Sequence, residues 1–432
     1  MSIMEFIICI LFLIVLIHIV NDKTLHMQSD IALLFFSLCI SVIILVVANF
    51  TGSEKFLETI RQVGDFGFEE YLIDFVLCFM LFAGASKVNM RKFKQNIKAV
   101  SLLALLSTVV SSVLFGLLFY VSARIAGLGC DIWVCILLGC IVSPTDPIAA
   151  TGILNKLGLS KNVTSIIENE SLFNDGTGVA LFVFIKSIVS QSGKSNFFIV
   201  MFKEIAGAVV VALLVSFVLF RILELTKNPV MHLLISFLDV SFVYVVCEHS
   251  GFSGVIASVV CGMYFAYKMD GISRSRKVFD PHNFYTDTWE VLDSILNAVL
   301  FVMVGISVLD IAFTVHLAFV VFVTIICVVV SRFMGVGIAS LLTGQKKIPS
   351  SYSLFEFVTL MTWSALKGGL SLALAMSTKE FLDYETYLIV LDAAYVTIFF
   401  TVLVQGLTIS RVYQKLEKHK AARIRSQSEV PR

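Results

Sequence analysis

Residues 139–153 read GCIVSPTDPIAATGI, an apolar stretch with two prolines three positions apart and an acid between them. Each proline removes a backbone donor and clashes with a preceding carbonyl, so a continuous helix through Pro144 and Pro147 is unfavourable. Thr145 and Asp146 lie between them, and apolar sequence continues on both sides. We therefore predict a helix broken at its middle, with Asp146 in the gap. The alternative is a kinked helix in which Asp146 is a cap beside a loop.

The sequence around this stretch is that of a polytopic membrane protein. Of the 432 residues, 58% are hydrophobic and 15% are charged, whereas about a quarter of a soluble domain is charged. The hydrophobic residues fall in blocks of roughly 18–25, the length of a membrane-spanning helix. Thirteen spans are predicted, near residues 3–20, 31–50, 70–86, 99–122, 132–153, 166–190, 197–221, 229–247, 251–267, 289–309, 311–341, 353–377 and 387–410.

The charged residues of the loops predict the orientation. Lys and Arg gather in one alternating set of loops and in the tail after residue 411, whereas the opposite loops are acidic. Because basic loops remain in the cytoplasm, the C-terminus is predicted to be cytoplasmic and the N-terminus to lie outside. The net charge of +1 provides no basic surface for nucleic acid. The nine cysteines include no CxxC pair, so we expect neither disulfides nor a transition-metal site.

A second polar segment, ENESLFNDGTG at residues 168–178, leads directly into apolar sequence. On a helix Glu170 and Asn174 share one face, and Ser171 and Asp175 share the neighbouring face, because each pair is four residues apart. The simpler interpretation is the polar start of a helix. That suits the first residue of the string but not Asp175, which lies about two turns further on.

Two cationic side chains also interrupt apolar sequence. Arg332 lies in TIICVVVSRFMGVGIAS, and Lys367 lies in LMTWSALKGGLSLALAM, where Gly368 and Gly369 weaken the helix. A buried Arg favours a bidentate carboxylate partner. The alternative for either cation is that it extends to the membrane surface.

The interrupted fifth and twelfth spans are seven apart and so cross the membrane in opposite directions. This is typical of inverted repeats with a binding site between broken helices near the midplane. We pair spans four to six with spans eleven to thirteen. The predicted fold class is an all-α polytopic membrane protein with two broken, crossing helices.

Asp146 and Asp175 would place two carboxylates on adjacent elements of a low-dielectric cavity. Burial favours a protonated carboxyl group and a nearby cation favours the ionised one, so such a site can hold either a proton or a small hard cation. The hydroxyls of Thr145 and Ser171 add oxygen ligands. Alternating access would then give exchange, with no enzyme active site and no cofactor. Because Asn174 cannot carry a proton, one cation per proton, and hence electroneutral exchange, is expected.

The strings SPTDPIAA and ESLFNDGT resemble the bacterial type of sodium/proton exchanger among the monovalent cation:proton antiporters. GFSGVIASVVCGM, WEVLDSILNAVLFVMVGI and LKGGLSLALAM agree with this, from about the third span to the thirteenth. The resemblance implies exchange of Na+ or Li+ for H+ across the cell membrane, in a setting of pH homeostasis. It implies that Asp175 binds the ion and the proton, and that the site is lined by Asp146, Thr145 and Ser171. It also implies that Glu170 pairs with Arg332 and that Asn174 braces this pair.

The resemblance further implies a homodimer in the lipid bilayer. Residues 1–86 and 226–310 would be a dimerisation scaffold, residues 87–190 and 311–410 a mobile core, and residues 191–225 a linking helix. Residues 411–432 would form a short basic cytoplasmic tail, which we expect to be disordered at its end.

Two positions depart from the family pattern. Ala83, in LFAGA, stands where members often carry Glu, and Lys367 stands where Arg is usual. The Lys367 ammonium can still offset the carbonyl ends of a broken helix, but without the planar fork of Arg. The sequence leaves the preference among Na+, Li+ and K+ and the pH profile open.

Three alternatives follow from the same residues. One is a K+/H+ or broad monovalent cation/H+ antiporter, and another is a channel or a non-transporting sensor with this fold. The third, an intramembrane aspartyl protease, would use YD and GxGD strings, whereas here Asp146 follows Thr and Asp175 follows Asn.

Overall fold

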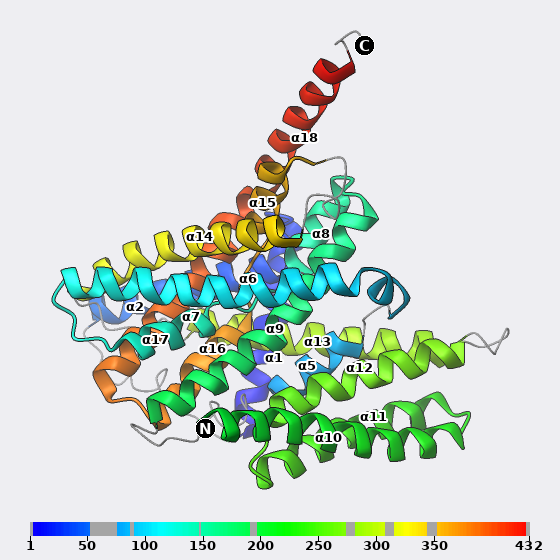
Figure 1. Cartoon of the computed structure of the whole chain (residues 1–432). Coiled ribbons are helices and arrows are strands. Elements are labelled where there is room, and N and C mark those ends of the chain that lie inside the picture. Colours follow the sequence, from blue (N-terminus) through cyan, green and yellow to red (C-terminus); the bar gives the residue numbers. More distant parts are fainter. Residues whose placement is uncertain are drawn as a thin grey trace. The chain divides into compact units, whose positions relative to one another are not determined.

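The computed structural model describes residues 3–51, 76–86, 90–146, 148–190, 197–273, 281–306, 315–343 and 352–428. Within these ranges the chain is helical, and extended segments pair only in one antiparallel bridge, between Asp146 and Leu366. Packing divides the chain into two compact units, and Figure 1 labels the helices of both. The prediction of an all-α fold is confirmed.

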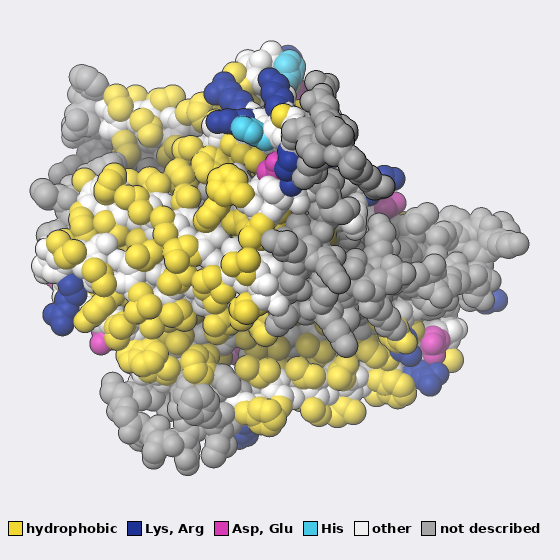
Figure 2. Space-filling model, turned by 45° about the horizontal axis from the view of Figure 1, so that its top comes forward, with side chains coloured by type: hydrophobic (Ala, Val, Ile, Leu, Met, Phe, Trp, Pro, Cys, Tyr) yellow, Lys and Arg dark blue, Asp and Glu magenta, His cyan; other side chains and the backbone are white. Residues whose placement is uncertain are grey.

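The helices follow the predicted spans. Each of the thirteen predicted ranges contains one or more helices among the described residues. Eight helices in this part of the chain are long and apolar enough to cross a membrane, by length and composition. Hydrophobic side chains cover most of the described surface in Figure 2, and an apolar surface of this extent is typical of contact with lipid. The protein is therefore a multi-pass membrane protein.

Unit 1 comprises residues 1–66, 98–178 and 299–432. Its helices are α1 (Ile3–Lys23), α2 (Ser29–Thr51), α7 (Ile132–Ile141), α8 (Ile148–Lys156), α14 (Val315–Thr343), α15 (Leu354–Trp363), α16 (Gly369–Met376), the 3₁₀ helix η4 (Ser377–Glu380), α17 (Tyr384–Phe399), the π-helix η5 (Phe400–Gln405) and α18 (Gly406–Ser428). Parts of α6 (Met90–Ile125), α9 (Lys161–Ser190) and α13 (Pro281–Ile306) complete it.

Unit 2 comprises residues 67–97 and 179–298. It contains α5 (Leu77–Ser86), α10 (Phe197–Glu224), α11 (Pro229–His249), α12 (Gly254–Ser273) and the remaining parts of α6, α9 and α13. Its core is aromatic: the Phe82 ring centroid lies 4.5 Å from that of Trp289 and 5.6 Å from that of Phe265. One acid, Asp239, is fully buried there, and its Oδ2 accepts hydrogen bonds from Ser216 Oγ (2.8 Å) and Cys261 Sγ (2.6 Å).

The fifth and twelfth spans are each two short helices, as predicted. Helix α7 ends at Ile141 and α8 begins at Ile148, and Pro144 lies in the gap. Pro147, the second predicted helix-breaking residue, lies outside the described residues. In the twelfth span, α15 ends at Trp363 and α16 begins at Gly369.

Small residues allow α6 to pack closely against both neighbours of the site. A Cβ atom on Gly139 of α7 would lie 2.1 Å from the Ser112 carbonyl oxygen of α6. A Cβ atom on Gly335 of α14 would lie 2.1 Å from Ser111 Oγ, also on α6. These contacts bring α7 and α14 against adjacent parts of α6, so the polar side chains of all three helices can meet.

The C-terminal tail begins as a helix, since α18 continues to Ser428. Tyr413 and Leu416 hold its first part, because they belong to a buried apolar cluster that includes α8 and α15 residues. Residues 429–432, the end that we expect to be disordered, lie outside the described residues. Further along α18, Arg423 Nη2 lies 3.1 Å from Glu356 Oε2 on α15.

Candidate ion-binding site

The two gaps of unit 1 meet at the site. The Asp146 backbone N–H donates to the Leu366 carbonyl oxygen at 2.8 Å, which forms the antiparallel bridge between the two extended segments. A Cβ atom on Gly368 would lie 3.1 Å from Asp146 Cβ, so the absence of a side chain there helps the segments to approach. The broken spans therefore cross at the residues that the sequence singled out.

One face of α9 reaches the first gap. The Thr145 backbone N–H donates to Asp175 Oδ1 at 3.0 Å, and Thr145 Oγ1 donates to Ser171 Oγ at 2.9 Å. A Cβ atom on Gly178 would lie 2.8 Å from Pro144 Cγ, so glycine at this position lets α9 come close to the gap. The predicted pair of Ser171 and Asp175 thus contacts Thr145 directly, and Asp146 is the next residue of the chain.

Asn174 connects the same gap to α6. It is fully buried, its Nδ2 donates to Thr145 Oγ1 at 3.1 Å, and its Oδ1 accepts from Thr108 Oγ1 at 2.8 Å. Both ends of the amide are therefore engaged, and Asn174 holds Thr145 at a fixed place beside Asp175.

The other face of α9 carries a buried ion pair. Arg332 Nη2 on α14 donates to Glu170 Oε2 at 2.8 Å, and the side chains are 5% and 1% exposed. Arg332 is therefore enclosed by protein and paired with a carboxylate. The expected bidentate geometry is not found, and the second oxygen of Glu170 accepts from Ser107 Oγ at 3.2 Å. Ser107 and Thr108, neighbours on α6, thus connect the ion pair with Asn174.

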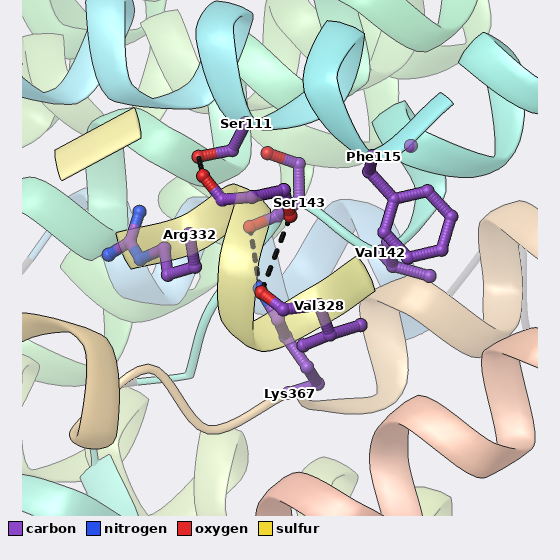
Figure 3. Close-up of a pocket in the computed structure, with 9 residues that line it drawn as sticks. Ser111, Phe115, Val142, Ser143, Val328, Arg332 and Lys367 are labelled. Atoms are coloured by element: carbon purple, nitrogen blue, oxygen red, sulfur yellow. Dashed lines mark hydrogen bonds between the residues drawn. The ribbon is translucent and has the colours of Figure 1, made fainter. Parts of the chain in front are cut away.

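Lys367 lies in the gap of the twelfth span and is buried. Its Nζ donates to the Ser143 carbonyl oxygen at 2.9 Å, just beyond the C-terminal end of α7 (Figure 3). A cation is favourable at this end of a helix, where carbonyl groups lack intrahelical partners. Its backbone N–H donates to Thr401 Oγ1 at 3.1 Å.

One protein family matches most of the chain. The family model described as "Sodium/hydrogen exchanger, transmembrane" matches residues 9–415. The chain belongs to this family. It is a secondary transporter and not an enzyme, which excludes the protease alternative.

Similar proteins of this family come from bacteria and archaea. The chain is 32% identical over 377 residues to the Na(+)/H(+) antiporter NhaP of Pseudomonas aeruginosa, covering 84% of this chain and 86% of that one. It is 27% identical over 358 residues to the Na(+)/H(+) antiporter NhaH of Halobacillus aidingensis, covering 81% and 84%. The solved structure of the sodium proton antiporter MjNhaP1 from Methanocaldococcus jannaschii shares the fold, with a TM-score of 0.74, 20% identity and coverage of 96% and 99%.

Several residues of this exchanger's site were not predicted from the sequence: Ser107, Thr108, Ser143 and Thr401. Ser and Thr in apolar helices commonly bond to a carbonyl of the preceding turn. Thr108 Oγ1 is also 2.6 Å from the Ala104 carbonyl, and Thr401 Oγ1 is 2.8 Å from that of Thr397. The residue type alone therefore does not indicate that a Ser or Thr belongs to the site. Thr401 lies in the π-helix η5, an element frequent at functional sites, but this too is seen only in the structure.

We expect Thr401→Val to slow cation/proton exchange several-fold, because the buried N–H of Lys367 loses its acceptor. Such an unpaired donor costs about 1–3 kcal/mol, and it lies in the gap that faces Asp146. Thr401→Ser keeps the acceptor and should restore the rate. Thr397→Val is the matched control, since Thr397 Oγ1 bonds to the Ala393 carbonyl one turn away. Equal rates for Thr401→Val and Thr397→Val in reconstituted vesicles would contradict this role.

Proposed function

We propose that this protein exchanges Na+, and also Li+, for H+ by alternating access, one cation for one proton. The observation that carries the proposal is the convergence of Asp175, Thr145 and Ser171 beside the gap of a broken membrane helix. The relatives named as Na(+)/H(+) antiporters support the choice of sodium.

In this mechanism Asp175 holds either the proton or the cation. When Asp175 is ionised, its carboxylate and the oxygens of Thr145, Ser171 and Asp146 offer the ligands that a small hard cation prefers. When Asp175 is protonated, its charge is removed and the cation is released. Competition for one carboxylate couples the two fluxes, because the empty ionised site is costly to carry across the membrane interior.

The neighbouring charges keep fixed roles in this scheme. Glu170 is paired with Arg332 and accepts from Ser107, so it does not exchange ions. Lys367 compensates the carbonyl end of α7 through Ser143. Asp175 is then the carboxylate whose charge changes during the cycle.

The cation series is tested in reconstituted vesicles that contain a pH-sensitive dye. With an imposed proton gradient, Na+, Li+ and K+ are added in turn between about pH 6 and 9, and dequenching is expected with Na+ and Li+. Empty liposomes provide the background. A response to K+ alone would replace the proposal by K+/H+ exchange, and no response to any of the three would reject antiport.

Electroneutral exchange is expected because one carboxylate changes its charge. Asn174, beside Asp175, cannot bind a second proton, and both ends of its amide are already bonded. The rate of Na+-driven proton movement should therefore be the same with and without a valinomycin-imposed membrane potential. A potential-sensitive dye verifies the imposed voltage, and a rate that follows the voltage would contradict the one-to-one ratio.

We also propose the family's arrangement for the whole protein: a homodimer with the N-terminus outside the cell membrane and the C-terminus in the cytoplasm. The predicted scaffold and mobile core remain part of this proposal. Exposed basic residues of α18 support the orientation: Arg411, Lys415 and Lys418.

A further inference from the structure

A cavity of about 10 Å³ lies in unit 1 beside the crossing of the broken spans (Figure 3). This is about the space that one water molecule requires. The wall is formed by α6, by the end of α7, by α14 and by the gap of the twelfth span. Residues of this wall include Ser111, Val142, Ser143, Val328, Arg332 and Lys367.

The Arg332 guanidinium has more donors than acceptors around it. Its Nη2 bonds to Glu170, but Nε and Nη1 are buried and have no acceptor among the described residues. A guanidinium keeps its charge in proteins and cannot avoid the cost by losing a proton. Buried donors are almost always satisfied, by protein or by ordered water. Arg332 therefore requires an additional hydrogen-bond acceptor.

The other polar groups of the wall define that acceptor. Lys367 brings a second cation to the same cavity, which disfavours a transported cation there. Ser143 Oγ is buried and has no hydrogen-bond partner in the described part of the chain. The fitting ligand is small, accepts from a cation and can donate to a hydroxyl oxygen. A water molecule has all three of these properties, whereas a chloride ion is larger and cannot donate a hydrogen bond.

We propose that this cavity binds one water molecule, which accepts from the Arg332 guanidinium and donates to Ser143 Oγ. The water joins the ion pair of α9 and α14 to the segment that continues into Thr145. The link restrains the gap of the fifth span at Ser143, two residues before Thr145. The water contacts none of the transported ions, so this proposal does not depend on which cation is exchanged.

The direct test is a high-resolution structure of the intact protein in lipid nanodiscs, determined in chloride and in bromide. A single peak at about 2.6–3.2 Å from Arg332 Nε or Nη1, unchanged in bromide, is expected. No peak in the cavity would overturn the proposal. A peak that becomes stronger in bromide would overturn it in favour of an anion.

A second test adds one methylene group to the cavity wall with Val328→Ile. It should displace the water and lower the melting temperature by about 2 °C or more. Val330→Ile, on the same helix at a 37% exposed position, is the matched control and should have no effect. An unchanged or higher melting temperature for Val328→Ile would show a dry cavity and overturn the proposal.

The same substitution is then made in the double variant Glu170→Gln, Arg332→Gln, which has no guanidinium. There Val328→Ile should lower the melting temperature less, because no guanidinium loses its acceptor. An equal fall in both backgrounds would mean simple overpacking and would also overturn the proposal.

Discussion

Asp175→Asn is expected to reduce Na+- and Li+-driven proton movement to the level of empty liposomes. The substitution keeps the size of the side chain, and its amide oxygen can still accept from the Thr145 N–H, so the crossing should remain assembled. What it removes is a group that can bind and release a proton and can offer a negative charge to a cation. Both fluxes depend on that group, so neither should persist.

The control for Asp175→Asn is the same substitution at Asp239, a fully buried acid of unit 2. Its partners Ser216 and Cys261 can still donate to an amide oxygen, and exchange should be unchanged. Thermal stabilisation by Na+ provides a second readout, because a ligand that binds the folded state raises its stability. This stabilisation should disappear in Asp175→Asn and persist in Asp239→Asn. Full exchange by Asp175→Asn would place the ion site elsewhere.

Glu170→Gln and Arg332→Gln are each expected to destabilise the protein by about 3–5 kcal/mol, because either leaves a buried charge without its partner. The pair is almost fully buried, at 2.8 Å, so solvent screens it little. The double variant removes both charges together. It should therefore be more stable than the sum of the two single losses implies.

The measurement is thermal unfolding, in the same detergent, of the unchanged protein, the two single variants and the double variant, which together form a double-mutant cycle. We expect a coupling of about 1–3 kcal/mol between the two positions. Lys186→Gln with Glu224→Gln, two helical positions in unit 2, forms a control pair that should be additive. Additive losses at Glu170 and Arg332 would show that the pair does not act as a unit.

Backbone chemistry made the two gaps predictable. Pro144, with the second proline of its motif, and the Gly368–Gly369 pair act through the main chain, so their effect needs no knowledge of the neighbours. The four-residue spacing on α9 can also be read from the local sequence, without knowledge of the neighbouring helices. It placed Glu170 and Asp175 on different faces, and the structure finds one against Arg332 and the other against Thr145.

The partners that come from other helices could not be predicted. Thr401 and Ser107 resemble any hydroxyl residue of an apolar helix until packing brings them to Lys367 and Glu170. The single hydrogen bond between Arg332 and Glu170 also depends on how α9 and α14 pack, which the local sequence does not show. The helical tail likewise depends on a tertiary contact, that of Tyr413 with the cluster of α8 and α15.

The bridge between Asp146 and Leu366 also bears on how the protein is made. Its two main-chain partners come from distant parts of the sequence, and the second lies in the twelfth span. Since a chain emerges from its N-terminus, Asp146 is synthesised long before the carbonyl that its N–H requires. A nascent chain that stops before the twelfth span has the acids of the site but lacks this bond. Assembly of the crossing is thus a late step of biogenesis, and the ability to bind a cation should arise only after the twelfth span has been inserted.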